Sequence, residues 1–534
     1  MVARRGADNG KARMRYDAIV VGAGINGLAA AVHLAAKGWK EVVLERADVP
    51  GGAVKTRELT RAGFRHDLYA MNLSLFAGSP FFAAHRQRLL AAGLEFVSAP
   101  RSFATAFPDG SWLGVEGNVE ATAERIATVS QADAARWRAM AAAFAQEAPH
   151  FFALLAAPLP SWEALRAIWQ AWRARGSAWV GQAGRLLVAS PRDWLDENFE
   201  SEKLKAMMGA WALHLDFSPD VAGGALFAYL ESMANQSFGM TIGRGGADTV
   251  VSAMVGAIKA AGGELRLGAE VTGIRIENGV AKGVALAGGE RLEADRAVIA
   301  NLNPRLLFGR LTPGWSSPAT ARLAKLRPGP GTMMIHLALS ELPAWNAGEA
   351  LKQFAYVHLA PSLASMARTY TDAFAGLLPA EPVLVVGQPT AIDPSRAPPQ
   401  RHVLWVQVRV LPFAIRADAA GSITATDWDV AKEAYADRVM DLIEGYAPGL
   451  QSKILARAVL SPLDLERDNP NLVDGDSLSG SHHLDQNFMF RPAFGWSRYR
   501  TPIARLYMIG AATWPGAGTG AGSGFRLATA LCGR

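Results

Sequence analysis

The chain has 534 residues, half of them hydrophobic, and a formal net charge of +6. This length and composition fit two or three globular domains and exclude a disordered chain. The single cysteine, Cys532, excludes an internal disulfide and a paired-cysteine redox centre.

Five basic residues open the chain: Arg4, Arg5, Lys11, Arg13 and Arg15. No apolar stretch follows them before the first predicted strand, so we do not expect a secretory signal. Residues 1–15 are predicted to be a flexible, solvated tail, with attraction to an anionic membrane surface as the alternative. The basic residues cluster nowhere else and no recognition motif is present, so no nucleic-acid partner is expected.

A glycine-rich turn follows the first predicted strand, residues 17–21. Gly22, Gly24 and Gly27 have the GxGxxG spacing, and an alanine-rich helix is predicted directly after them, over 28–37. This setting is the dinucleotide-binding fingerprint, in which glycines let a pyrophosphate approach the helix N-terminus.

The second predicted strand, 42–44, ends at Glu45. An acid in this position binds ribose hydroxyls and disfavours a 2′-phosphate. Gly51 and Gly52 follow closely, and we expect them to bring a second loop back to the ligand; an ordinary Pro-Gly turn is the alternative.

Residues 119–235 are predicted to be mainly helical. Large apolar side chains follow one helical face within this region: Trp162, Leu165, Ile168, Trp169 and Trp172. Such a stripe is more often domain core or a subunit contact. With arginines beside it, docking to a membrane interface is the alternative.

The centre of the chain returns to an alternation of helix and strand. A helix is predicted over 250–261, strands over 264–267, 269–274 and 291–300, and a hairpin turn at Asn278-Gly279. Further along, strands are predicted over 332–339 and 403–410, and proline-rich surface loops over 378–400.

A second glycine-rich loop follows the last predicted strand, with glycines at Gly510, Gly516, Gly518, Gly520 and Gly522. Glycine at this density lets backbone amides approach a ligand. Two such cradles at opposite ends of one chain indicate a single large dinucleotide held by both.

These motifs together resemble the FAD-dependent phytoene-desaturase-like oxidoreductases, and most closely the pyridine nucleotide-disulphide oxidoreductase domain-containing protein 2 group. The resemblance rests on Glu45-Arg46, Gly51-Gly52, the final loop, and residues 52–56, 63–67, 481–486, 491–492 and 499–502. The chain departs from the pattern at Ala53, where carotenoid desaturases usually have arginine. It departs again at Trp514, where relatives often have histidine.

The resemblance implies an α/β fold in which a Rossmann-type FAD-binding domain is interleaved with an α+β substrate domain, as in amine oxidases and phytoene desaturases. The FAD-binding domain is expected to comprise residues 16–75, 240–305 and 500–534. The substrate domain is expected to comprise 76–239 and 306–499.

The resemblance also assigns residues to FAD. Val271 is expected over the adenine, Gly510 and Ala511 near the pyrophosphate, and Gly518 to Gly520 near the isoalloxazine ring. The full expected set is Gly22, Gly24, Asn26, Gly27, Glu45, Arg46, Gly51, Gly52, Ala53, Val271, Asn301, Gly510, Ala511, Gly518, Thr519 and Gly520.

Candidates beside the flavin, by the same resemblance, are His66, Asp67, Tyr69, Asn72, Asp485, Arg491 and Trp514. Arg491 or Lys55 is expected to stabilise negative charge on the reduced ring. His482-His483 is interpreted as a structural or surface pair because no second ligand cluster accompanies it, so no metal is predicted.

The expected function is desaturation, saturation or isomerisation of a C–C or C=C unit in a hydrophobic, isoprenoid or lipid-like substrate, by hydride transfer at flavin N5. A flavin amine oxidase, a non-catalytic flavoprotein scaffold and a chain without FAD are the alternatives. We expect a cytoplasmic protein, with peripheral membrane contact or a homo-oligomer as further options.

Overall fold

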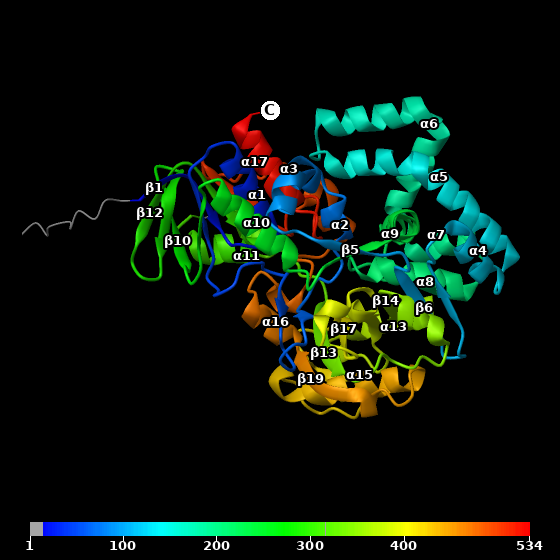
Figure 1. Cartoon of the computed structure of the whole chain (residues 1–534). Helices are drawn as coiled ribbons and strands as arrows, with labels where there is room; N and C mark the ends of the chain where they lie inside the picture. The colour runs from blue at the N-terminus through cyan, green and yellow to red at the C-terminus, as the bar shows by residue number, and fades with distance from the viewer. Residues whose placement is uncertain (1–13, 316, 534) are drawn as a thin grey trace, which may run out of the picture.

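The computed structural model describes residues 14–315 and 317–533. The predicted tail lies outside these ranges except at its end, where Arg15 already begins the first strand. Two seven-stranded sheets and a region of long helices make up the molecule (Figure 1).

The first sheet is mainly parallel and takes its strands from three distant parts of the chain. Their order is β10 (Val271–Glu277), β11 (Val280–Leu286), β12 (Arg291–Asn301), β1 (Arg15–Val21), β2 (Glu41–Leu44) and β9 (Glu264–Arg266), with β20 (Leu506–Ile509) also paired to β12. Strands β1, β2, β9, β12 and β20 pair in parallel, and β10 and β11 form an antiparallel extension. The parallel strands consist of apolar runs because both faces of the sheet are buried.

Helices α1 (Ile25–Ala36), α10 (Thr249–Ala260) and α17 (Gly522–Cys532) belong to the same core as this sheet (Figure 1). Helices α1 and α17 come from opposite ends of the chain and touch at Gly524. A Cβ at Gly524 would lie 1.8 Å from the carbonyl oxygen of Asn26. Glycine is therefore required for the N-terminal and C-terminal segments to pack together.

A region of long helices occupies residues 119–238 and forms the right-hand edge of the molecule in Figure 1. Its members are α4 (Val119–Ala127), α5 (Gln131–Ala156), α6 (Trp162–Val188), α7 (Pro191–Asn198), α8 (Glu202–Leu213) and α9 (Ala225–Phe238). Ser130, Ser161, Ser190 and Ser201 cap four of them by accepting backbone N–H groups.

The second sheet has the order β19 (Ile454–Leu460), β13 (Gly331–Leu339), β17 (His402–Leu411), β16 (Val383–Gly387), β14 (Tyr356–Leu359), β6 (Phe103–Ala106) and β7 (Trp112–Gly114). Helix α15 (Trp428–Tyr446) covers one face, and α8 and α13 (Leu363–Phe374) lie against the other (Figure 1). The sheet is antiparallel apart from β6, which joins β14 in parallel.

The interpretation of 378–400 as surface loops is wrong. This segment contains β16, a fully buried interior strand of the second sheet, and the buried Arg396. The prolines of this segment favour loops, but Val383 to Val386 have β-branched and apolar side chains that fit a buried strand.

The remaining elements are short connections around these layers. They are β3 (Thr56–Arg57), β4 (His66–Asp67), α2 (Ser74–Ala77), α3 (Pro80–Ala91), β5 (Phe96–Ala99), β8 (Met240–Gly243), α11 (Pro304–Leu306), α12 (Pro318–Leu323), β15 (Leu377–Leu378), α14 (Pro389–Ile392), β18 (Ala417–Asp418) and α16 (Pro462–Asp468). Among residues 14–315 and 317–533, no helix combines the length and apolar character needed to cross a bilayer.

Candidate cofactor site

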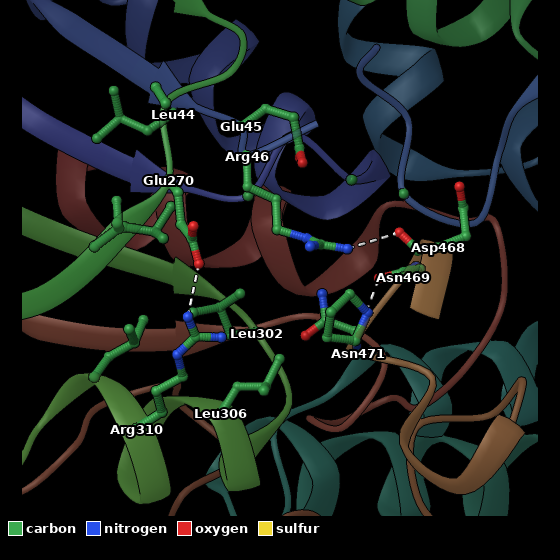
Figure 2. A pocket seen from close by; sticks show the side chains of 18 of the residues that line it. Leu44, Glu45, Arg46, Glu270, Leu302, Leu306, Arg310, Asp468, Asn469 and Asn471 are labelled. Atoms are coloured by element: carbon green, nitrogen blue, oxygen red, sulfur yellow. Dashed lines mark hydrogen bonds and ion pairs between the residues drawn. The ribbon is translucent and has the colours of Figure 1, made fainter. Parts of the chain in front are cut away.

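A cleft with a volume of about 110 Å³ opens at the carboxyl ends of β1 and β2 (Figure 2). In open parallel sheets, ligands bind at this edge. The cleft is lined by Val21, Gly22, Gly24, Leu44, Glu45, Arg46, Gly52, Lys55, Ala269, Glu270, Val271, Leu302, Leu306, Arg310, Leu311, Asp468, Asn469, Pro470 and Asn471.

The glycines of the N-terminal turn form a cradle that side chains would fill. A Cβ at Gly27 would lie 2.2 Å from the carbonyl oxygen of Gly22, and one at Gly24 would lie 2.9 Å from Nδ2 of Asn301. Gly52 approaches from the second loop, where an added Cβ would lie 3.1 Å from Cα of Gly24. Backbone N–H groups can therefore meet a phosphate directly at the start of α1.

Glu45 lies at the end of β2 and faces the cleft (Figure 2). Its Oε2 accepts the N–H of Ala23 at 2.8 Å and its Oε1 accepts the N–H of Ala47 at 3.0 Å. Each oxygen keeps a second lone pair for a ribose hydroxyl. Val271, from β10, lines the same cleft.

The other wall carries an ion pair and a loop that the sequence did not assign to this site. Arg310 donates to Glu270 at 2.7 Å (Figure 2). Residues 468–471, expected in the substrate domain, also line the cleft. The Asn-Pro turn at 469–470 was the only local signal of a loop there.

Asp468 connects the cleft to the interior. Its Oδ2 accepts Nζ of Lys55 at 2.8 Å and the hydroxyl of Tyr69 at 2.5 Å. Burial opposes ionisation, yet these two hydrogen bonds outweigh it and hold the pKa of Asp468 below its usual range. Arg46 donates to the carbonyl oxygen of Asp468 at 2.9 Å, which fixes the loop to the end of β2.

Asn301 and Asn26 join the two glycine-rich ends of the chain. Nδ2 of Asn301 donates to the carbonyl oxygen of Gly22 at 3.3 Å, and a Cβ at Gly510 would lie 2.9 Å from Oδ1 of Asn301. Asn26 accepts the hydroxyl of Ser523, which in turn accepts the N–H of Gly510. Neither asparagine lines the cleft.

The C-terminal loop extends away from the cleft and lines none of it. The hydroxyl of Thr519 donates to the carbonyl oxygen of Asn72 at 3.4 Å, and a Cβ at Gly518 would lie 2.8 Å from Leu75. His482 accepts the N–H of Ala517 at 3.2 Å, and burial keeps the pKa of this imidazole well below its usual range.

Arg491 holds the C-terminal loop in place through hydrogen bonds to the backbone. It is fully buried, and its Nε, Nη1 and Nη2 donate to the carbonyl oxygens of Leu478, Gly480, Ser481 and Ala511. Burial lowers its pKa to about 10, so it stays charged at neutral pH. Because all three nitrogens already donate to the backbone, the structure gives Arg491 the role of a loop clamp.

Trp514 is also buried. Its Nε1 donates to the carbonyl oxygen of Ala157 at 2.8 Å, beside the end of α5, and its ring packs on Phe488. The carbonyl oxygen of Trp514 accepts the hydroxyl of Tyr499 at 3.0 Å. This side chain therefore ties the C-terminal loop to the helical region.

The remaining candidates for contact with the flavin do not lie together in the structure. His66 is buried, contacts Thr60 at 2.8 Å and is neutral because burial lowers its pKa to about 4. Asp67 forms a buried ion pair with Arg396. Asp485 pairs with Arg327 at the surface, away from the cleft.

Ala53 and Gly51 support the second loop from behind the cleft lining: Gly51 donates to the carbonyl oxygen of Ala23 at 2.9 Å. His483 contacts Tyr370 at 2.9 Å, apart from the contact that His482 makes with the C-terminal loop. Within the part of the chain that the structure describes, no group of three metal-binding side chains is present.

Comparison with known families bears on this cleft. The family of flavin containing amine oxidoreductases matches residues 25–522. The chain belongs to this family. It is an FAD-dependent oxidoreductase of the phytoene-desaturase-like superfamily.

Similar proteins include the mouse pyridine nucleotide-disulfide oxidoreductase domain-containing protein 2, which is 29% identical over 96% of this chain and 92% of its own. A neurosporene-forming phytoene desaturase of Cereibacter sphaeroides is 26% identical over 94% of this chain and 91% of its own. The crystal structure of a Methanosarcina mazei oxidoreductase has a TM-score of 0.60 and 19% identity, covering 97% of this chain and all of that one. This last likeness shows the fold.

The cleft fits FAD, the cofactor of this family. Gly24 and Gly52 line the cleft, and side chains there would crowd Asn301 and Gly24; a side chain at Gly27, behind the lining, would push the turn at Gly22 out of place. The lining glycines would hold the pyrophosphate, Glu45 the ribose, and Val271 the adenine. Contact between residues 510–520 and the isoalloxazine end remains a prediction.

Proposed function

We propose that this enzyme oxidises or reduces a C–C or C=C unit in a hydrophobic substrate. The observation that carries the proposal is an apolar and aromatic cluster that begins at Tyr69, next to the cofactor cleft. It continues through Met71, Tyr356 and Trp405 on the second sheet. Relatives named as phytoene desaturases support the same reading.

Bound FAD supplies a hydride acceptor and donor at N5. The chain's own residues would position the substrate against an apolar surface. Trp405 donates from Nε1 to the carbonyl oxygen of Tyr69 at 3.0 Å and stacks on Tyr356 with ring centroids 5.6 Å apart. These contacts fix the positions of three aromatic side chains, all of them buried, between Asp468 and the second sheet.

Tyr69 holds its proton at neutral pH because burial and the neighbouring Asp468 raise its pKa well above the usual range. Lys55 balances the charge of Asp468 across a 2.8 Å contact. The three side chains form a neutral, hydrogen-bonded unit between the cofactor cleft and the apolar cluster. Hydrogen bonds hold these three side chains in place, and no proton transfer among them is needed for this role.

The experiment that tests the proposal is anaerobic bleaching of the flavin absorbance by a panel of isoprenoids, fatty acyl compounds and amines. Bleaching by an isoprenoid or acyl compound, or oxidation of dithionite-reduced enzyme by an unsaturated one, is expected. Bleaching by amines alone would establish the amine oxidase instead. A flavin that no compound reduces would favour a non-catalytic flavoprotein.

We also propose that α6 contacts a membrane surface. Ala164, Ala167 and Ala171 form its buried face, so the tryptophan stripe points to solvent and the expectation of a core stripe is wrong. Trp162 is 82% exposed and Trp169 55%. Arg166 and Arg173 flank the stripe, which suits anionic headgroups, and a hydrophobic substrate would enter from the same surface.

A further inference from the structure

The inner face of the second sheet is polar at one end, unlike its outer face. Strand residues alternate between faces, so Leu404, Val406 and Val408 of β17 pack with α15, whereas Trp405, Gln407 and Arg409 face α8 and α13. Arg409, Gln407 and their neighbours His358 and Thr105 are all buried. A sheet face built only to pack on helices would carry aliphatic side chains here.

Several polar atoms on this face have no hydrogen-bond partner. They are Nε of Arg409, Nε1 of Trp211, Nε2 of His214, both ring nitrogens of His358 and Oγ1 of Thr105. The Trp211, His214 and His358 rings lie together, with centroids 4.6 to 5.3 Å apart. Buried polar groups are nearly always paired with protein, water or a ligand, so a cluster of unpaired ones needs an occupant.

Arg409 is the cationic group of this cluster. Its Nη2 donates to the carbonyl oxygens of Leu213 at 3.2 Å and His214 at 2.6 Å, and among the described residues no ion pair forms on it. Burial lowers its pKa to about 10, which leaves it charged at neutral pH. The buried carboxylates of Asp216 and Asp476 attract Arg409 from a distance but form no hydrogen bond with it. An anionic ligand bonded to Nε would supply the direct partner that this guanidinium lacks.

The unpaired atoms also define which ligand fits. Arg409 and Trp211 can only donate, whereas the neutral imidazole of His358 offers one N–H and one acceptor nitrogen. The two groups that can only donate, Arg409 and Trp211, favour an oxygen-rich anion over a cation. Planar guanidinium and carboxylate groups match in two parallel hydrogen bonds.

A row of rings connects this cluster with the cofactor side. Trp405, hydrogen-bonded to Tyr69, stacks on Tyr356, and Tyr356 stacks on His358 at 6.4 Å. An apolar chain lying along these rings would reach from the neighbourhood of Tyr69 to that of Arg409. The row is continuous with the cluster on which the proposed function rests.

We propose that the inner face of the second sheet binds the carboxylate of an acidic, long-chain substrate at Arg409, Trp211, His214 and His358. The inference rests on the proposed function and narrows it from hydrophobic compounds in general to apolar chains that end in a carboxylate. A pure hydrocarbon would leave every donor of the cluster unpaired.

The test compares binding of oleate, oleyl alcohol and octadecene to the FAD-loaded protein, followed by tryptophan fluorescence and by perturbation of the flavin spectrum. We expect oleate to bind at least about tenfold more tightly than the alcohol. Arg409→Met should abolish this preference while octadecene binding stays the same. Arg409→Lys should keep part of it, because the charge remains and the planar fork is lost.

Two further variants separate a specific loss of carboxylate binding from a general effect of substitution. Trp211→Phe keeps an aromatic ring and removes one donor, so it should weaken oleate binding alone. Arg457→Met, at a β19 position whose side chain pairs with Asp437 and Glu433 of α15, should leave the binding of all three ligands unchanged. Equal affinity for oleate and oleyl alcohol in the FAD-loaded wild type, or release of FAD by Arg409→Met, would overturn the inference. A wild type that binds no FAD would overturn the proposed function instead.

Discussion

At Gly27 a single methyl group decides whether the cofactor site can exist. The helix start packs so closely on the preceding turn that a Cβ would overlap the carbonyl oxygen of Gly22 at 2.2 Å. The same carbonyl is held by Asn301, which also borders Gly510. One substitution would therefore disturb both glycine-rich ends.

Gly27→Ala is expected to weaken FAD binding on the order of 100-fold, because the turn must open to admit the methyl group. Equilibrium dialysis with FAD measures the change. Gly445→Ala is the matched control, since nothing lies within 4 Å of its added Cβ and α15 is helical there. Full FAD retention by Gly27→Ala would contradict the placement of the pyrophosphate.

Glu41 provides a pH-dependent prediction. Burial raises its pKa from 4.5 to about 8, and neither carboxyl oxygen has a partner. The folded protein therefore keeps the proton through a range in which the unfolded chain loses it. Folding stability should fall as pH rises from about 5 to 8, by linkage between proton binding and folding.

Glu41→Gln removes this dependence because the amide does not ionise. The variant should match the wild type near pH 4.5 and exceed its melting temperature by on the order of 3 °C at pH 8. Thermal unfolding followed across this range measures the difference. The exposed Glu124→Gln serves as control, and a constant offset between Glu41→Gln and wild type at every pH would count against the explanation.

At the scale of the element, helix α6 is the clearest case in which the apolar stripe predicted from the sequence lies on the exposed face. Its alanines pack inward and its tryptophans point outward, the reverse of a helix that simply contributes to a core. The peripheral position of α6 in Figure 1 leaves this face open to another surface.

A triple substitution of Trp162, Trp169 and Trp172 to serine should abolish co-sedimentation with vesicles containing phosphatidylglycerol, because the anchoring rings are lost. Val430→Ser, an equally exposed apolar position on α15, should leave sedimentation unchanged. If the wild type is a dimer that the triple substitution dissociates, without any effect on vesicles, the face binds a second copy and the membrane proposal fails.

At the scale of the whole molecule, the cofactor site joins segments that lie hundreds of residues apart. Strand β20 pairs with β12, and α17 packs on α1 through Gly524. A ligand that contacts the N-terminal turn and the C-terminal loop together would stabilise the entire first sheet.

FAD should therefore stabilise the protein more than ADP, which fills only the cleft. At a free ligand concentration 100 times Kd, linkage gives about 2.7 kcal/mol for either ligand, so the comparison must be made at equal concentrations. Melting temperatures of the apoprotein titrated with each ligand give the result. Gly518→Ala should reduce the FAD effect and spare that of ADP; equal loss of both would mean that the C-terminal loop does not reach the flavin.

Local patterns predicted the parts of this protein that depend on local backbone geometry. The spacing of Gly22, Gly24 and Gly27 specified a turn, and the apolar runs at 17–21 and 42–44 specified buried strands. The family resemblance supplied the FAD assignment and the interleaved fold, both of which the comparisons confirm. These features depend on neighbours a few residues away and on a pattern shared by the whole family.

Tertiary structure alone decided what distant segments do to one another. Asp468 reaches Lys55 and Tyr69 across about 400 residues, and Asn301 meets Gly22 and Gly510 from two sides. Arg491 binds backbone carbonyl oxygens of the C-terminal loop and its neighbours. Arg409 faces α8, and the alternation of residues along β17 cannot predict which helix lies on that face. Hydrogen bonds and burial at these sites depend on which strands pair, and pairing between remote strands is set by the packed core as a whole.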